Sequence, residues 1–306
     1  DNFLTLGVDT VPVEVLYDLL EFDFVLNHPI FSRFTTVEFR YIHSRYTSVL
    51  ESFLLPETGQ LVPSSSDLYL IGNDLALTFS HKAIVPSRTS SINPVGRKLS
   101  LRVDMEFNKF NGDGEYTINS SGGLSPVYKD VDFPRVELRW KEYLPFFFEN
   151  QTVTLWFRGG SILGSAVDNF FDFYAGGLPG MRGYPFYSLG GNEFGIIGLN
   201  YRFPLLNQID LRVFNFYFDK LYASVFVDYG DAWTGDIPAL KDMKADAGAE
   251  LRLESFSFYS FPTRIFFSAT YGFDTFTQFI ASRNTTVRYG EEWNFHFGIL
   301  FDFDID

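Results

Sequence analysis

The sequence alternates between apolar and polar residues over many short segments, and this period of two constrains the fold most strongly. Between Lys98 and Phe110, apolar side chains occupy every second position: Leu99, Leu101, Val103, Met105 and Phe107. Polar residues stand between them: Ser100, Arg102, Asp104, Glu106 and Asn108. Successive side chains of a β-strand point to opposite faces of the sheet. The segment is therefore predicted to be a strand with one apolar and one polar face.

Similar alternation recurs along the chain and predicts about eleven strands, several long enough to span a bilayer when tilted. We expect them to begin near Val15, Thr35, Leu75, Lys98, Arg135, Thr152, Phe194, Leu221, Ala245, Arg264 and Trp293. A further short strand is expected within residues 3–8. No internal repeat or linker divides the sequence, so we expect residues 1–306 to form one all-β domain.

Alternation alone also fits a soluble β-sandwich, which has one apolar face per sheet. Two features favour a transmembrane antiparallel β-barrel. Aromatic residues make up 19% of the chain, and outer-membrane barrels place many aromatic rings on the lipid-facing surface and at both interfaces. The polar faces carry charges of both signs in mid-strand, as expected of a water-filled lumen. No run of 18 apolar residues predicts a transmembrane helix.

The connections between the expected strands roughly alternate in length, as do the short periplasmic turns and long external loops of outer-membrane barrels. The short connections comprise residues 27–33, 145–150 and 257–262, and the long ones 47–67, 111–131, 163–191 and 274–289. Residues 84–97 and 205–219 occupy positions where this alternation predicts a short connection, but they are not short.

The chain begins at Asp1 without a signal peptide. Because a barrel must be exported, we expect a signal to have been removed or left out.

Composition and motifs argue against several classes of chemistry. The net charge of −14 argues against a nucleic-acid partner, because phosphate binding requires a basic face. The chain has no cysteine, and the four histidines (His28, His43, His81 and His296) are not spaced as metal ligands. Neither a nucleophile elbow nor a phosphate-binding loop is present. We therefore expect no enzyme activity, no metal and no cofactor.

One long connection and the strands after it carry the motifs that point to a family. The connection and the next strand contain GGLPGMRGYPFYSLGGNEFGIIGLNYRFPLL, in which Arg182, Gly183 and Tyr184 follow a glycine pair. The second strand after it reads FVDYGDAW and carries Phe226, Asp228 and Gly230. This arrangement resembles the bacterial surface antigen barrel superfamily, which includes Bam-type outer-membrane insertases, Tam-type assembly factors and two-partner secretion transporters. The resemblance extends over about residues 133–303.

The resemblance implies that the long connection is the sixth external loop and folds back into the lumen. The tip arginine, Arg182, is then expected to pair with Asp228, which the alternation places on the lumen face. Asn200 stands where the family often has an acid and is expected to hydrogen-bond the same guanidinium. The resemblance also implies a barrel of about sixteen strands, an even number as in other bacterial outer-membrane barrels. We therefore expect the missing strands to precede Asp1, since unpaired backbone groups are costly in lipid.

The last expected strand resembles the C-terminal signal by which outer-membrane barrels are recognised for assembly. Its pattern places a polar residue, a glycine, a hydrophobic residue and an aromatic residue at His296, Gly298, Phe301 and Phe303. Such a strand can pair edge-on with an insertase by strand addition. The alternative is an ordinary amphipathic strand.

By resemblance, the expected function is insertion, assembly or translocation of polypeptides at the bacterial outer membrane. The expected partners are outer-membrane lipid, a substrate polypeptide, and periplasmic or lipoprotein subunits. A barrel that only anchors a fused periplasmic or surface domain is the first alternative. A passive porin is the second, and a loop folded into the lumen argues against it.

Overall fold

The computed structural model describes residues 2–6, 9–13, 15–54, 59–87, 92–118, 124–146, 148, 150–258, 261–280 and 285–301. Within these residues the protein consists of β-strands and three short 3-10 helices, η1 (Asn169–Phe171), η2 (Phe186–Ser188) and η3 (Leu240–Asp242). Among the described residues, none of the helices has the length and hydrophobicity of a membrane-spanning helix. The all-β prediction is confirmed.

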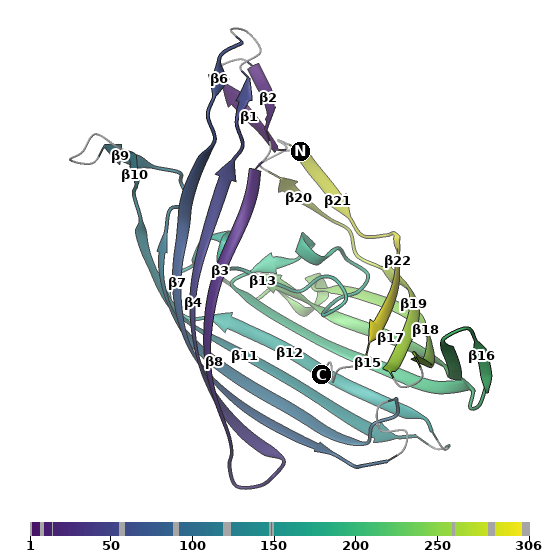
Figure 1. The fold of residues 1–306 in the computed structure, drawn as a ribbon. Coiled ribbons are helices and arrows are strands. Elements are labelled where there is room, and N and C mark those ends of the chain that lie inside the picture. Colours follow the sequence, from purple (N-terminus) through teal and green to yellow (C-terminus); the bar gives the residue numbers. More distant parts are fainter. Residues whose placement is uncertain are drawn as a thin grey trace. The chain divides into compact units, whose positions relative to one another are not determined.

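Twelve strands form one large antiparallel sheet, labelled in Figure 1. Eleven of them are long: β3 (Val15–Pro29), β4 (Thr35–Leu50), β7 (Ser65–Ile84), β8 (Gly96–Phe110), β11 (Lys129–Pro145), β12 (Thr152–Ile162), β15 (Glu193–Leu206), β17 (Phe216–Trp233), β18 (Lys244–Ser257), β19 (Phe261–Gly272) and β22 (Trp293–Phe301). Strand β16 (Leu211–Val213) adds a short hairpin to β17. The pairing order is β22-β19-β18-β17-β15-β12-β11-β8-β7-β4-β3, so β22 and β3 are its terminal strands.

The remaining strands form small hairpins within the connections. They are β1 (Asn2–Leu6) with β2 (Asp9–Val13), β5 (Phe53–Leu54) with β6 (Leu61–Val62), β9 (Tyr116–Ile118) with β10 (Leu124–Pro126), β13 (Phe173–Tyr174) with β14 (Gly190–Gly191), and β20 (Phe276–Ile280) with β21 (Thr285–Tyr289). The connections of residues 47–67, 111–131, 163–191 and 274–289 each contain one of these hairpins. The expected strand within residues 3–8 is the first strand of the β1–β2 hairpin.

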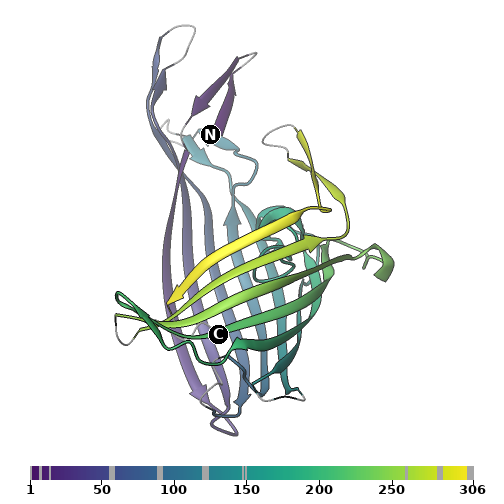
Figure 2. The same cartoon turned by 90° about the vertical axis from the view of Figure 1, so that its right-hand side faces the viewer.

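The chain comprises two compact units. The first contains Asp1–Pro29, Val37–Thr78 and Arg102–Arg135, and the second contains Ile30–Thr36, Phe79–Leu101 and Val136–Asp306. In the second unit, β12, β15, β17, β18, β19 and β22 pair in that order (Figure 2). In β17, Phe226 and Asp228 are buried while Val225 and Val227 are exposed. We call the buried side of these strands the inner face and the exposed side the outer face.

The structure corrects several predicted strand starts, including those of β11 (Lys129, not Arg135) and β17 (Phe216, not Leu221), and the largest correction concerns β7. A strand was expected to begin near Leu75, but β7 begins ten residues earlier, at Ser65. Gly72 interrupts the apolar pattern, and glycine in a strand interior usually marks a weak point. Here a Cβ on Gly72 would lie 2.7 Å from Ser44 Oγ and 2.9 Å from Asn108 Oδ1. The glycine therefore makes room for neighbouring side chains and does not end the strand.

The outer face of the second unit is apolar and exposed over adjacent strands. Its exposed side chains include Ile197, Leu199, Val225, Val227, Leu251, Phe267, Phe295, Phe297 and Ile299. In β22, exposed and less exposed residues alternate along the whole strand. Soluble proteins rarely expose contiguous apolar patches of this kind, whereas a lipid-facing surface requires them.

Candidate functional site

The loop between β12 and β15, residues 163–192, is folded into a compact segment. Its two halves are joined by the β13–β14 pair and by a bridge between Gly176 and Met181. The backbone turns between them, where the amide of Gly177, with φ of +78°, donates to the carbonyl of Tyr184 over 2.9 Å. Ala175 and Met181 are fully buried. The loop therefore has its own packed interior and holds its tip in a defined position.

The tip residue Arg182 makes a two-bond contact with Asp228 of β17. Its Nε donates to Asp228 Oδ2 over 3.0 Å and its Nη2 donates to Asp228 Oδ1 over 3.1 Å. The side chain of Arg182 is 13% exposed and that of Asp228 is 0% exposed. The guanidinium also lies 3.2 Å from the ring centroid of Phe226. Two parallel bonds to a carboxylate and a facing aromatic ring are the contacts that guanidinium geometry favours.

A second buried carboxylate, Asp246 of β18, was missing from the sequence prediction. In the β17–β18 register it lies directly opposite Asp228, and it is fully buried. Its Oδ2 accepts a hydrogen bond from the backbone amide of Gly183 over 2.9 Å. A Cβ on Gly183 would lie 2.5 Å from the Cβ of Asp246. Only glycine allows the backbone to approach the strand this closely.

Asn200 does not make the expected contact. It lies on β15 opposite Phe226 of β17, and its side-chain Oδ1 is buried without a hydrogen-bond partner. The guanidinium of Arg182 therefore does not donate to it; its Nε and Nη2 both donate to Asp228 instead. The second acid near the tip comes from β18 and not from the strand of Asn200. Gly230, the last residue of the strand motif, is buried opposite Ile196.

Tyr184 links the tip to the backbone of β18 and of the connection after β19. Its hydroxyl lies 3.0 Å from the carbonyl of Ala245 and 3.2 Å from that of Asp274, and it accepts from the amide of Asp274 over 3.0 Å. Its ring packs against Phe276 with a centroid separation of 5.8 Å. The side chain is almost fully buried. The hydroxyl therefore joins β18 to the segment that follows β19.

The carbonyl of Gly183 adds a contact with β22, where Asn294 Nδ2 donates to it over 2.8 Å. Arg182, Gly183 and Tyr184 thus contact β17, β18, β22 and the connection after β19. The loop motif and the strand alternation identified the tip and one of its partners. The other partners were missed because alternation gives the face of a residue but not which residues the tip meets.

The residues of the expected C-terminal signal lie on β22, except for Phe303, which falls outside the described residues. His296 lies opposite Ser268 and Gly298 lies opposite Phe266. Phe301 is exposed on the outer face. These positions agree with an amphipathic last strand, and the recognition signal itself stays a prediction.

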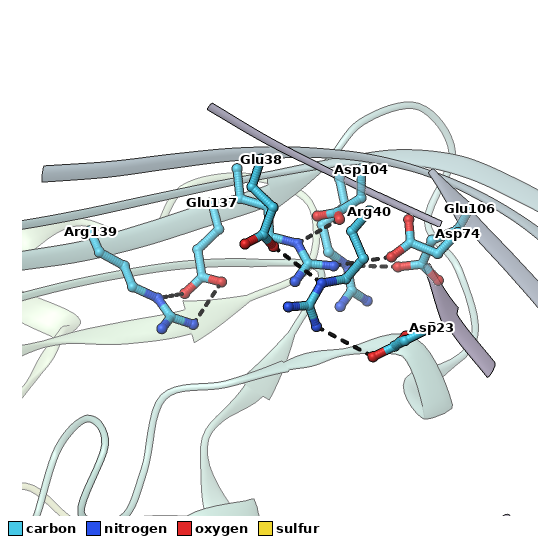
Figure 3. Close-up of polar contacts among 10 residues, drawn as sticks. Asp23, Glu38, Arg40, Asp74, Asp104, Glu106, Glu137 and Arg139 are labelled. Atoms are coloured by element: carbon cyan, nitrogen blue, oxygen red, sulfur yellow. Dashed lines mark hydrogen bonds and ion pairs between the residues drawn. The ribbon is translucent and has the colours of Figure 1, made fainter. Parts of the chain in front are cut away.

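In the first unit, ion pairs join neighbouring strands (Figure 3). Arg102 of β8 contacts Asp104 over 2.6 Å and Asp74 of β7 over 3.0 Å, and Asp104 is almost fully buried. Arg40 of β4 contacts Asp23 of β3 over 3.5 Å. Each guanidinium therefore lies between two strands and balances carboxylates there. Such mixed charges in mid-strand are suited to a polar barrel wall.

Within the described part of the chain, no group of three or more His, Asp or Glu side chains is arranged to hold a metal ion.

A model of the Omp85 superfamily domain matches residues 35–299, which is most of the chain and includes the tip loop and both buried carboxylates. No curated protein matches the chain. Omp85 superfamily domains are typical of bacterial outer-membrane proteins. The match, the antiparallel sheet and the position of the tip loop agree, and the chain belongs to the Omp85 superfamily.

Proposed function

We propose that this chain forms the outer-membrane barrel of a factor that inserts, assembles or translocates polypeptides. The proposal is carried by the match to the Omp85 superfamily domain. It is supported by the tip arginine, Arg182, which is bound by a buried carboxylate of β17. The proposed lumen lock consists of Arg182, Gly183, Tyr184 and Asp228, with Asp246 added and Asn200 left out of the hydrogen bonding.

The two faces of the second unit support a barrel in lipid. The outer face exposes large apolar side chains on adjacent strands, and the inner face carries ion pairs such as Arg252–Glu250 and Arg264–Glu254. A polypeptide presents backbone and side-chain polar groups, and hydrogen bonds to a polar wall can offset the cost of desolvating them. The loop of residues 163–192 lies against the inner face through its tip. This position favours a regulated path over the open channel of a passive porin.

Depletion of the protein from its own cells would test this function. We expect depletion to lower the amounts of other outer-membrane barrels or of secreted polypeptides. Wild-type protein should restore them, and Arg182→Ala should restore them only in part. Asp236→Asn is the matched control, because Asp236 is exposed and lies outside the proposed lock. Unchanged outer-membrane and secreted proteins after depletion would contradict the proposal. Loss of only one domain attached to this chain would favour an anchor instead.

A further inference from the structure

The loop of residues 163–192 carries three aromatic side chains in mutual contact. Tyr187 meets Tyr174 with a ring-centroid separation of 4.8 Å at 83° and meets Phe186 with 4.6 Å at 86°. Tyr174 and Phe186 are 5.9 Å apart at 33°. We call these three residues the aromatic cluster. Tyr187 is 67% exposed and Phe186 is 44% exposed, so the cluster presents ring surface that the loop does not cover.

The backbone holds this cluster in place. Tyr174 belongs to β13, which pairs with β14, and Phe186 and Tyr187 belong to η2. Ser188, also in η2, is buried and its Oγ donates to the carbonyl of Pro185 over 2.7 Å. The rings therefore project from two fixed segments. A rigid set of rings can bind a ligand without a large loss of side-chain entropy.

The charges around the cluster are negative. Asp168 and Asp172 flank it, and burial together with the negative charge of Asp172, and that of Asp168 to a lesser extent, raises the pKa of the Tyr174 hydroxyl. Between residues 159 and 201 the sequence contains a single cation, Arg182. That guanidinium is bonded to Asp228, so its charge is already balanced on β17. The exposed rings therefore lie in a negative part of the loop.

We propose that the aromatic cluster, with Asp168 and Asp172 beside it, binds basic side chains of a polypeptide. Ring faces are negative and attract ammonium and guanidinium groups, and the exposed ring surface of Tyr187 and Phe186 is open to such a cation. The two carboxylates add a longer-range attraction that salt weakens. A neutral apolar segment would gain from the rings but not from the carboxylates. The proposal rests on the proposed function, because it names the part of a substrate polypeptide that the loop contacts.

Peptide binding by the full-length protein in detergent micelles would test the site. The probe is a short fluorescent peptide of glycine and lysine, and the control probe is the same peptide with every lysine acetylated. We expect the lysine peptide to bind more tightly than the acetylated one. Raising the salt concentration should reduce that difference.

Variants on the loop assign the binding to the cluster. Tyr187→Leu should weaken binding of the lysine peptide by about 2- to 30-fold, the range of one cation–aromatic contact. Asp172→Asn should weaken it as well and reduce its salt dependence, while the amide can still accept the 2.7 Å bond from Asn192 Nδ2. Phe170→Leu is the matched control, because Phe170 is an exposed aromatic residue of the same loop outside the cluster.

Three results would overturn the site: no binding of the lysine peptide, equal binding of the acetylated peptide, or equal losses in Tyr187→Leu and Phe170→Leu. The test is independent of the depletion experiment. If the peptide binds through the cluster while depletion has no effect, the site stands and the proposed function fails. If depletion lowers other barrels while the peptide does not bind, the function stands and the site fails.

Discussion

The contact between Arg182 and Asp228 allows a quantitative test of the lumen lock. Removing one partner of a buried ion pair costs about 3–5 kcal/mol, because the other charge remains without compensation. Arg182→Ala would leave Asp228 fully buried and directly opposite another buried carboxylate, Asp246. We therefore expect this variant to lose about 3–5 kcal/mol of loop stability.

The reverse substitution should cost less. After Asp228→Ala, the guanidinium of Arg182 keeps the Phe226 ring, 3.2 Å from its centroid, and remains under the electrostatic influence of Asp246. We expect a loss of about 1–3 kcal/mol, in the range of a lost hydrogen bond to a charged group. The double variant should lose no more than Arg182→Ala alone, because most of the cost of that change comes from the Asp228 carboxylate left behind, and the double variant removes this carboxylate as well.

Protease cleavage within residues 163–192, measured against urea concentration in detergent micelles, reports the free energy of loop release. A double-mutant cycle over the four proteins isolates the coupling between the two side chains. Arg288 and Glu291 provide the matched control, since their 2.7 Å ion pair is largely exposed, and its coupling should stay below about 1 kcal/mol. Additive losses for Arg182 and Asp228, or equal losses for both single variants, would refute this reasoning.

Three further predictions concern the tip and the last strand. Gly183→Ala places a Cβ 2.5 Å from that of Asp246, so it should displace the loop and cost about 1–3 kcal/mol; unchanged protease resistance would contradict this. Tyr184→Phe leaves the part-buried backbone amide of Asp274 without its 3.0 Å acceptor and should cost about 1–3 kcal/mol in urea unfolding; a stability within error of wild type would remove this role. Phe303→Ala should lower the yield of folded protein in the outer membrane, and a normal yield and insertion rate would show that Phe303 is not part of a recognition signal.

Sequence pattern predicted the local features of the fold well. Alternation identified all eleven long strands, and the starts of β3, β4, β12 and β22 agree with prediction. It also assigned Asp228 to the inner face, because side-chain direction in a strand depends only on position within that strand. The loop motif identified Arg182 as the tip residue that bonds to it.

Features that depend on more than one segment were not predictable from pattern. In the alternating pattern Asp246 looks like any other inner-face residue of its strand. Only the β17–β18 register places it opposite Asp228. Register is set by pairing with the neighbouring strand, which the alternation of one strand does not determine. The aromatic cluster has the same origin, since Tyr174 and Tyr187 are brought together by the β13–β14 pair and the turn between its strands.

The contacts of the tip tripeptide also imply an order of events during folding. The bond from Asn294 to Gly183 closes a separation of 111 residues, and the bond from Arg182 to Asp228 closes one of 46. Contacts between distant residues form late, because the chain must first lose the entropy of closing the intervening loops. The tip has all of its partners only after β17, β18 and β22 have assembled. Protease resistance of residues 163–192 should therefore appear in the last kinetic phase and mark the completion of the C-terminal half of the sheet.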